Sequence, residues 1–195
     1  MDSERSPLRG AAREQAILEA TVALVAEVGY ERVTVNAIAA RAHASKATMY
    51  SRWPGKAELV ADAVRRHADR GVAEAPDTGS LRGDLLAAVS AIATTFDGAG
   101  GGLTLPGLVE ALRADPALRD VVRGQIGDRC RQDGLSICRQ AVARGERADE
   151  TRGPEALGLA VAHLFLQTIL GGTPPTTAEQ QTFVDRILLP LICTD

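Results

Sequence analysis

The feature of this sequence best suited to chemistry is a stretch of positive charge that contains no acid. Between residues 32 and 57 there is no Asp or Glu, and the positive residues are Arg32, Arg41, Lys46, Arg52 and Lys56. A run of this kind often forms a solvated helix face without a partner. It also attracts phosphate groups, as in proteins that bind nucleic acids. The elements that position these side chains therefore matter for the interpretation.

Two short helices are predicted inside this stretch. Apolar spacing indicates helices over residues 35–41 and 45–51, joined by a three-residue turn at 42–44. This is the spacing of a helix-turn-helix, whose second helix enters the major groove of DNA. Thr34 and Ser45 are the predicted N-caps. Neither has Glu or Gln three residues later, so simple caps are expected rather than capping boxes.

The ends of these helices offer groups that can hold phosphates. A helix N-terminus presents free backbone N–H groups and the positive end of the helix dipole, so Thr34 and the amides after it are predicted to hold one phosphate. Lys56, at the start of the next helix, can hold another. Tyr50 offers a hydroxyl at the end of the second short helix.

Residues 34–60, TVNAIAARAHASKATMYSRWPGKAELV, resemble the N-terminal DNA-binding region of the TetR/AcrR family of bacterial repressors. The family pattern reads roughly T-x-x-x-I-A-x-x-A-G-V-S-x-x-T-[LI]-Y-x-x-F-x-x-K-x-x-L. The resemblance implies that Thr34 and Lys56 bind phosphates. It implies contacts to base edges or the adjacent backbone by Ser45, Lys46, Ala47 and Thr48. It implies further phosphate contacts by Tyr50, Ser51 and Arg52. It assigns to packing between helices Ile38, Ala39, Met49 and Trp53.

The chain departs from the family pattern in the turn, where His43 stands in place of the usual glycine. Such a turn often needs a left-handed backbone, which glycine adopts freely and other residues adopt at a cost. We therefore expect either modest strain at His43 or a slightly different turn. A protonated His43 touching a phosphate is the alternative, although a neutral imidazole is the default near pH 7.

The rest of the chain is predicted to be helical as well, because apolar residues recur at helical spacing and no segment alternates with period two. Further helices are expected over residues 11–28, 56–71, 81–96, 104–113, 116–144 and 153–170, with a last one opened by a capping box from Thr177 to Gln180. The expected fold class is all-α with about nine helices. An N-terminal helix-turn-helix head of three helices covers residues 1–55. A larger C-terminal helical domain, to which the resemblance assigns ligand binding and dimerisation, covers 56–195.

The formal net charge of −3, taken alone, argues against a nucleic-acid partner. Read by segment it does not, because residues 1–71 hold 11 basic and 9 acidic residues, whereas residues 72–195 hold 11 basic and 16 acidic ones. The acidic excess lies outside the predicted DNA-binding region.

The three cysteines show no metal-like CxxC spacing and are too few for a disulfide framework in a chain of 195 residues. No signal peptide is visible, and the apolar run 156–170 is short for a membrane span and contains His163 and Gln167. We therefore expect a cytoplasmic protein, nucleoid-associated when bound to DNA, with no membrane partner, no metal and no cofactor.

The predicted helix 153–170 is apolar nearly all round, whereas a surface helix of a monomer has one apolar stripe. A second apolar side indicates that another chain packs against this helix. Family members pair their last two helices into a four-helix dimer interface. The resemblance therefore implies a homodimer held by Leu157, Val161, Leu164, Phe165, Phe183, Ile187 and Leu188. A dimer also supplies two recognition helices for a pseudo-palindromic operator, about 34–36 Å apart. The alternative is a central helix wholly buried in a monomer.

An effector pocket in the helical domain is the least specific of these predictions. Its candidate lining residues are His67, Phe96, Leu112, Ile126, Cys130, Ile137, His163 and Gln167. Each of these is also explained as plain core, although polar groups on apolar faces are suited to orienting an unknown small molecule. The mechanism implied is a population shift, in which the ligand favours a dimer that no longer fits the operator.

The predicted function is a ligand-responsive DNA-binding transcriptional regulator, most simply a repressor that a small molecule releases. Two alternatives remain open: a helical dimeric adaptor without DNA binding, and a small enzyme using the helical-domain pocket. The three histidines are scattered, no HExxH or GxSxG motif occurs, and residues 98–103 do not fit GxGxxG. We therefore do not expect an enzyme.

Overall fold

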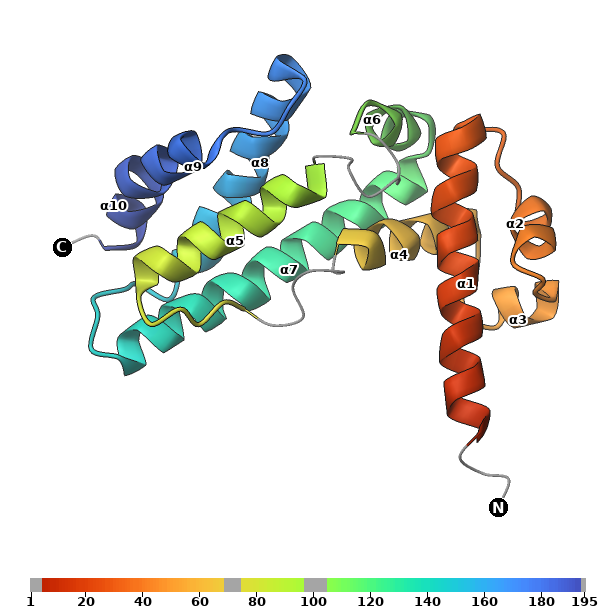
Figure 1. Ribbon diagram of the computed structural model, residues 1–195, viewed down its shortest axis with the longest axis horizontal. Helices are drawn as coiled ribbons and strands as arrows, with labels where there is room; N and C mark the ends of the chain where they lie inside the picture. The colour runs from red at the N-terminus through yellow and green to blue at the C-terminus, as the bar shows by residue number, and fades with distance from the viewer. Residues whose placement is uncertain (1–4, 69–74, 97–104, 194–195) are drawn as a thin grey trace. The chain divides into compact units, whose positions relative to one another are not determined.

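The computed structural model describes residues 5–68, 75–96 and 105–193, without the side chains of 5–9, 67 and 68 (Figure 1). Residues 98–103, which do not fit the GxGxxG pattern, lie outside the described residues. The described residues are helical apart from turns and links, and no strand occurs among them. The first four helices are α1 (Arg5–Val28), α2 (Val35–Arg41), α3 (Lys46–Tyr50) and α4 (Lys56–Ala68).

The other helices follow the predicted order closely. They are α5 (Leu81–Phe96), α6 (Leu105–Ala114), α7 (Pro116–Ala143), α8 (Gly153–Gly171), α9 (Thr177–Phe183), the π-helix η2 (Val184–Leu188) and α10 (Leu189–Ile192). Because α9, η2 and α10 run on without a break, the described residues form nine helical segments, and the expected all-α class is confirmed. The capping box of α9 was predicted one residue too late. Thr176 is the N-cap and Glu179 supplies the returning carboxylate, since Glu is as suited to this position as Gln.

The chain forms two compact units, each with its own hydrophobic core. The first unit comprises Met1–His67 and Gly100–Val122. Its core is built on α1, α2 and α4 and also takes in Ala111, Leu118 and Val122 from α6 and the start of α7. All four residues assigned to helix packing, Ile38, Ala39, Met49 and Trp53, are buried there, as predicted.

The second unit comprises Ala68–Ala99 and Arg123–Asp195. Its core joins α5, α8 and the last helical segment to α7 through apolar residues such as Leu85, Ile137, Leu164 and Leu188. Helices α7 and α8 meet at two glycines. A Cβ on Gly134 would lie 2.4 Å from the carbonyl carbon of Gly153, so only glycine permits this approach. The three cysteines are free, in line with the absence of a disulfide framework.

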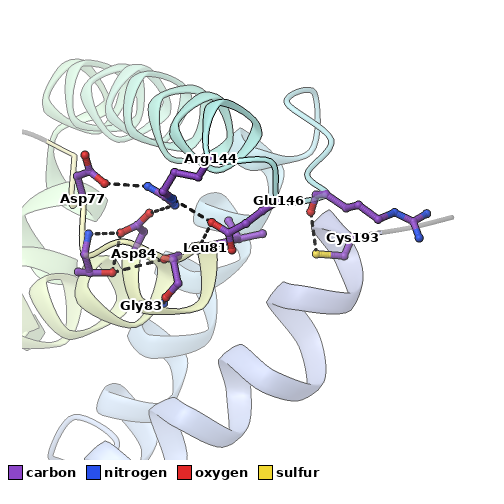
Figure 2. A network of polar contacts seen from close by, with 10 residues as sticks. Asp77, Leu81, Gly83, Asp84, Arg144, Glu146 and Cys193 are labelled. Atoms are coloured by element: carbon purple, nitrogen blue, oxygen red, sulfur yellow. Dashed lines mark hydrogen bonds and ion pairs between the residues drawn. The ribbon is translucent and has the colours of Figure 1, made fainter.

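A buried carboxylate ties the start of α5 to the end of α7 in the second unit (Figure 2). Asp84 is fully buried and accepts hydrogen bonds from the Thr78 amide at 2.6 Å and the Thr78 hydroxyl at 2.8 Å. Arg144 Nη2 donates to its other oxygen at 2.7 Å. The same guanidinium binds Asp77 and Glu146, and Glu146 in turn accepts from the Leu81 amide at the first turn of α5. The cluster thus provides hydrogen-bond partners both for a free backbone N–H at the start of α5 and for the buried Asp84 carboxylate.

Candidate nucleic-acid interface

The two short helices begin at the residues predicted to cap them. Thr34 Oγ1 accepts a hydrogen bond from the Ala37 amide at 3.1 Å, and Ser45 Oγ accepts one from the Thr48 amide at 3.1 Å. Ser45 Oγ also lies 2.8 Å from Thr48 Oγ1. Each cap satisfies one backbone N–H of the first turn of its helix, and a helix N-terminus generally leaves further N–H groups for a partner.

The side chains predicted to contact DNA lie mainly on the surface of the first unit. The exposed members of this group are Thr34, Ser45, Lys46, Ala47, Tyr50, Ser51 and Arg52, while Thr48 and Lys56 are half-buried. Tyr50 is an aromatic residue with 53% of its surface exposed, which leaves its hydroxyl and ring open to a partner. Lys46 is exposed in the first turn of α3, the helix that should read the groove.

Lys56 is engaged by a neighbour that sequence reasoning missed. Its ammonium donates to the Tyr30 carbonyl at 3.1 Å and lies 4.0 Å from the centroid of the Tyr30 ring. The buried Tyr30 hydroxyl donates to Asp115, the N-cap of α7, whose other oxygen accepts from the Ala117 and Leu118 amides. The hydrogen bond from Tyr30 lowers the pKa of the Asp115 carboxyl. The pKa of Tyr30 is raised, mainly because the side chain is buried and also because of this hydrogen bond.

Arg52, the first residue after the C-cap of α3, is held from two sides. Its Nη2 forms an ion pair with Glu14 Oε2 on α1 at 2.8 Å, and its guanidinium lies 5.9 Å from the centroid of the Trp53 ring. Its side chain still keeps 55% of its surface exposed. Glu14 was not among the predicted site residues, because it precedes the helix-turn-helix and no local pattern links it to Arg52.

The turn adopts the left-handed backbone that the glycine of the family pattern indicates. His43 has φ of 50°, and it is the only non-glycine residue with positive φ among those described. Its side chain is exposed. Histidine tolerates this region better than bulky residues do, so the turn keeps its geometry at modest strain.

Replacing His43 by Val should lower the free energy of unfolding by about 1–2 kcal/mol relative to His43→Gly, because a β-branched residue is poorly suited to positive φ. Urea unfolding of both variants, at equal protein concentration, measures this difference. Equal stability of the two variants would show that the turn does not depend on the left-handed conformation.

The predicted ligand residues are spread over several environments rather than gathered. Leu112 packs on the core of the first unit. Cys130 and Ile137 are buried in the core of the second, while Ile126 and Gln167 are exposed. The Phe96 ring meets Phe165 edge-on, and the His163 ring stacks on Phe183 at 4.1 Å between centroids. Although His67 belongs to α4, its side chain lies outside the described residues.

The predicted dimer residues differ in how far they are exposed in the single chain. The structure buries four of them in the core of their own subunit, namely Leu157, Leu164, Phe183 and Leu188. Side chains already removed from solvent gain little further apolar burial from a second chain, so these four would add little apolar area of their own to an interface. Val161 and Phe165 are half-buried, and Ile187 is 46% exposed. The apolar surface of α8 that remains open consists instead of Leu159, Leu166, Ile169 and Leu170.

Family models match most of the chain in two parts. The model described as bacterial regulatory proteins, tetR family, matches residues 17–63. The model described as tetracyclin repressor-like, C-terminal domain, matches residues 75–187. The fold and the helix-turn-helix therefore define a bacterial DNA-binding regulator of transcription.

Whole-length relatives agree with these matches. The chain is 40% identical over 189 residues to an uncharacterized HTH-type transcriptional regulator of Mycobacterium tuberculosis, covering 97% of this chain and 92% of the relative. It is 34% identical over 184 residues to a protein of Mycobacteroides abscessus named DNA-binding transcriptional repressor TetR, covering 94% and 96%. The chain belongs to the TetR family.

Solved structures share the fold at lower identity. A putative TetR-family transcriptional regulator from Mesorhizobium loti matches with a TM-score of 0.62 and 20% identity, covering 95% of this chain and 99% of that one. The transcriptional regulator FadR from Bacillus subtilis, solved in complex with stearoyl-CoA, matches with a TM-score of 0.58 and 14% identity, covering 91% and 97%.

Proposed function

We propose that this protein is a homodimeric repressor that binds a pseudo-palindromic operator through α3. It dissociates from the operator when a small molecule binds the C-terminal helical domain. The observation that carries the DNA-binding site is the exposed row of groups at the two capped helices, Thr34, Ser45, Lys46, Tyr50 and Arg52. Free amides, hydroxyls and cations on one short motif are the groups that bind phosphates and base edges. The protein acts in the cytoplasm, on the nucleoid when bound.

A second copy of the chain is the proposed cover for the open face of α8. Leu159, Leu166, Ile169 and Leu170 recur at helical spacing and keep between 37% and 77% of their surfaces exposed. Among the described residues, α8 is also the one helix long and apolar enough to cross a bilayer by length and composition alone. An apolar stripe on a regulator that reads a two-fold operator is suited to a symmetric interface.

The proposed effector response is a population shift. A small molecule that binds one arrangement of the dimer better than another biases the pair of recognition helices away from the operator spacing. His163 and Gln167 on α8 are the polar groups proposed to orient that molecule.

DNA binding is tested with a duplex recovered by in vitro selection with the wild-type protein from a random pool. Lys46→Ala should lower the affinity for this duplex at least tenfold and reduce the slope of log affinity against log salt by about 2, because one phosphate contact is lost in each of the two proposed subunits. Fluorescence anisotropy measures both quantities.

Arg131→Ala is the matched control, since Arg131 is an exposed cation of the second unit. It should leave the affinity near that of the wild type, and thermal melting should be unchanged for both variants. If the folded wild-type protein selects no duplex, the repressor function is excluded. If Lys46→Ala binds as the wild type does, Lys46 is not part of the interface.

A further inference from the structure

The structure points to a positioning residue for DNA binding outside the helix-turn-helix, and we infer that Glu14 on α1 holds Arg52 in the orientation that meets a DNA phosphate. This inference rests on the proposed function, because it assigns a role within the same interface. Glu14 lies before residue 17, where the match to the DNA-binding family model begins.

The Glu14 carboxylate is placed to fix more than one guanidinium. Only 12% of its side chain is exposed, and its two oxygens separately bind Arg52 and Arg66. Arg66 also approaches Asp62 at 4.0 Å, and Asp62 accepts the hydrogen bond of the Trp53 indole at 3.0 Å. These polar contacts within the first unit fix the position of the Glu14 carboxylate, so it can in turn fix the position of the Arg52 guanidinium.

Arg52 is fixed at three points and yet remains open to a ligand. Its backbone amide donates to the Met49 carbonyl at 3.1 Å, directly after α3. Its guanidinium forms an ion pair with the Glu14 carboxylate and lies 5.9 Å from the centroid of the Trp53 ring, and 55% of the side chain is exposed. A guanidinium carries five N–H donors in a planar fork, so an ion pair along one edge leaves others for a phosphate.

Two opposite effects of Glu14 on DNA binding can be distinguished by sign. A carboxylate near the interface repels phosphates, so its removal alone would tighten binding. A carboxylate that pre-orders Arg52 saves the loss of side-chain freedom on binding, so its removal weakens binding. The low exposure of Glu14 and its two arginine partners favour the second effect, because its charge is already neutralised within the first unit.

The test is a double-mutant cycle on the duplex selected by the wild-type protein. Glu14→Gln should lower the affinity about three- to tenfold, although it removes a negative charge. Arg52→Ala should reduce the salt slope by about 2, one phosphate contact in each proposed subunit, and Glu14→Gln should reduce it in the same direction. In the Arg52→Ala background, Glu14→Gln should have no effect on affinity, because no guanidinium remains to be positioned.

Glu19→Gln is the matched control, with the same charge change on the same helix and its carboxylate bound to Gln15 rather than to Arg52. It should not weaken binding. Circular dichroism checks the fold of each variant, and Glu14→Asp, which retracts the carboxylate from Arg52, should also lower affinity if Glu14→Gln does not fold. A Glu14→Gln protein that binds as tightly as the wild type, or a loss that persists in the Arg52→Ala background, overturns the inference. If the wild-type protein selects no duplex, it is the proposed function that fails.

Discussion

Replacing Asp84 by Ala is expected to lower the free energy of unfolding by about 3–5 kcal/mol. The carboxylate is fully buried, and three donors converge on it from Thr78 and Arg144 (Figure 2). Hydrogen bonds to a buried charged acceptor are worth more than neutral ones, and their loss leaves the Thr78 amide without its partner. Urea unfolding at fixed protein concentration measures the change.

Two further variants separate charge from packing at this position. Asp84→Asn keeps an oxygen for Thr78 but removes the charge that Arg144 faces, so its loss of stability should lie between those of wild type and Asp84→Ala. Asp185→Ala is the matched control, because Asp185 forms a two-bond pair with Arg82 in which both side chains are over 40% exposed. An exposed pair contributes little, so this variant should unfold close to wild type. An equal loss at Asp84 and Asp185 would contradict the importance of burial.

The sequence predicted the elements well because local signals set most of them. The caps Thr34 and Ser45 each act within one helical turn, and both are found where expected. Helix α7 also begins at Pro116, the first residue of the range predicted for it. The resemblance also indicated a turn that often needs a left-handed backbone, and His43 adopts that backbone. The shift of the α9 capping box by one residue shows the limit, since Thr176 and Thr177 have acceptable partners three residues later.

Long-range pairings could not be predicted in the same way. Glu14 meets Arg52 and Tyr30 meets Asp115 only because separate helices pack together in the first unit, and a single sequence carries no local sign of either pair. The same reason applies to the two faces of α8. Periodicity shows that α8 has more than one apolar face, but it does not tell which face the subunit's own core covers.

Helix α8 has one apolar face in the core of the second unit and another apolar face that is exposed. Leu157 and Leu164 lie seven residues apart and fill the core, whereas Leu159 and Leu166 have the same spacing two residues later and remain at least 41% exposed. A shift of two residues is about 200° around a helix, so the two pairs point in nearly opposite directions. The second face therefore stays available for a second copy of the chain.

Changing Leu166 and Leu170 together to Glu is expected to convert the proposed dimer into a monomer that keeps its helical fold. These side chains are 53% and 77% exposed, so they contribute little to the subunit's own core. Four negative charges would face one another across a two-fold interface and lose their hydration there, which disfavours association strongly. Light scattering after size-exclusion chromatography measures the mass, and circular dichroism measures the fold.

The same double variant should bind the selected duplex at least 100-fold more weakly, since two linked recognition helices gain affinity through the high effective concentration of the second. Ile126→Glu is the control, because Ile126 is 43% exposed on α7 and lies outside the α8 surface. It should leave mass and affinity unchanged. A double variant that remains dimeric would exclude this face as the interface, and a monomer with wild-type affinity would show that operator binding does not require two subunits.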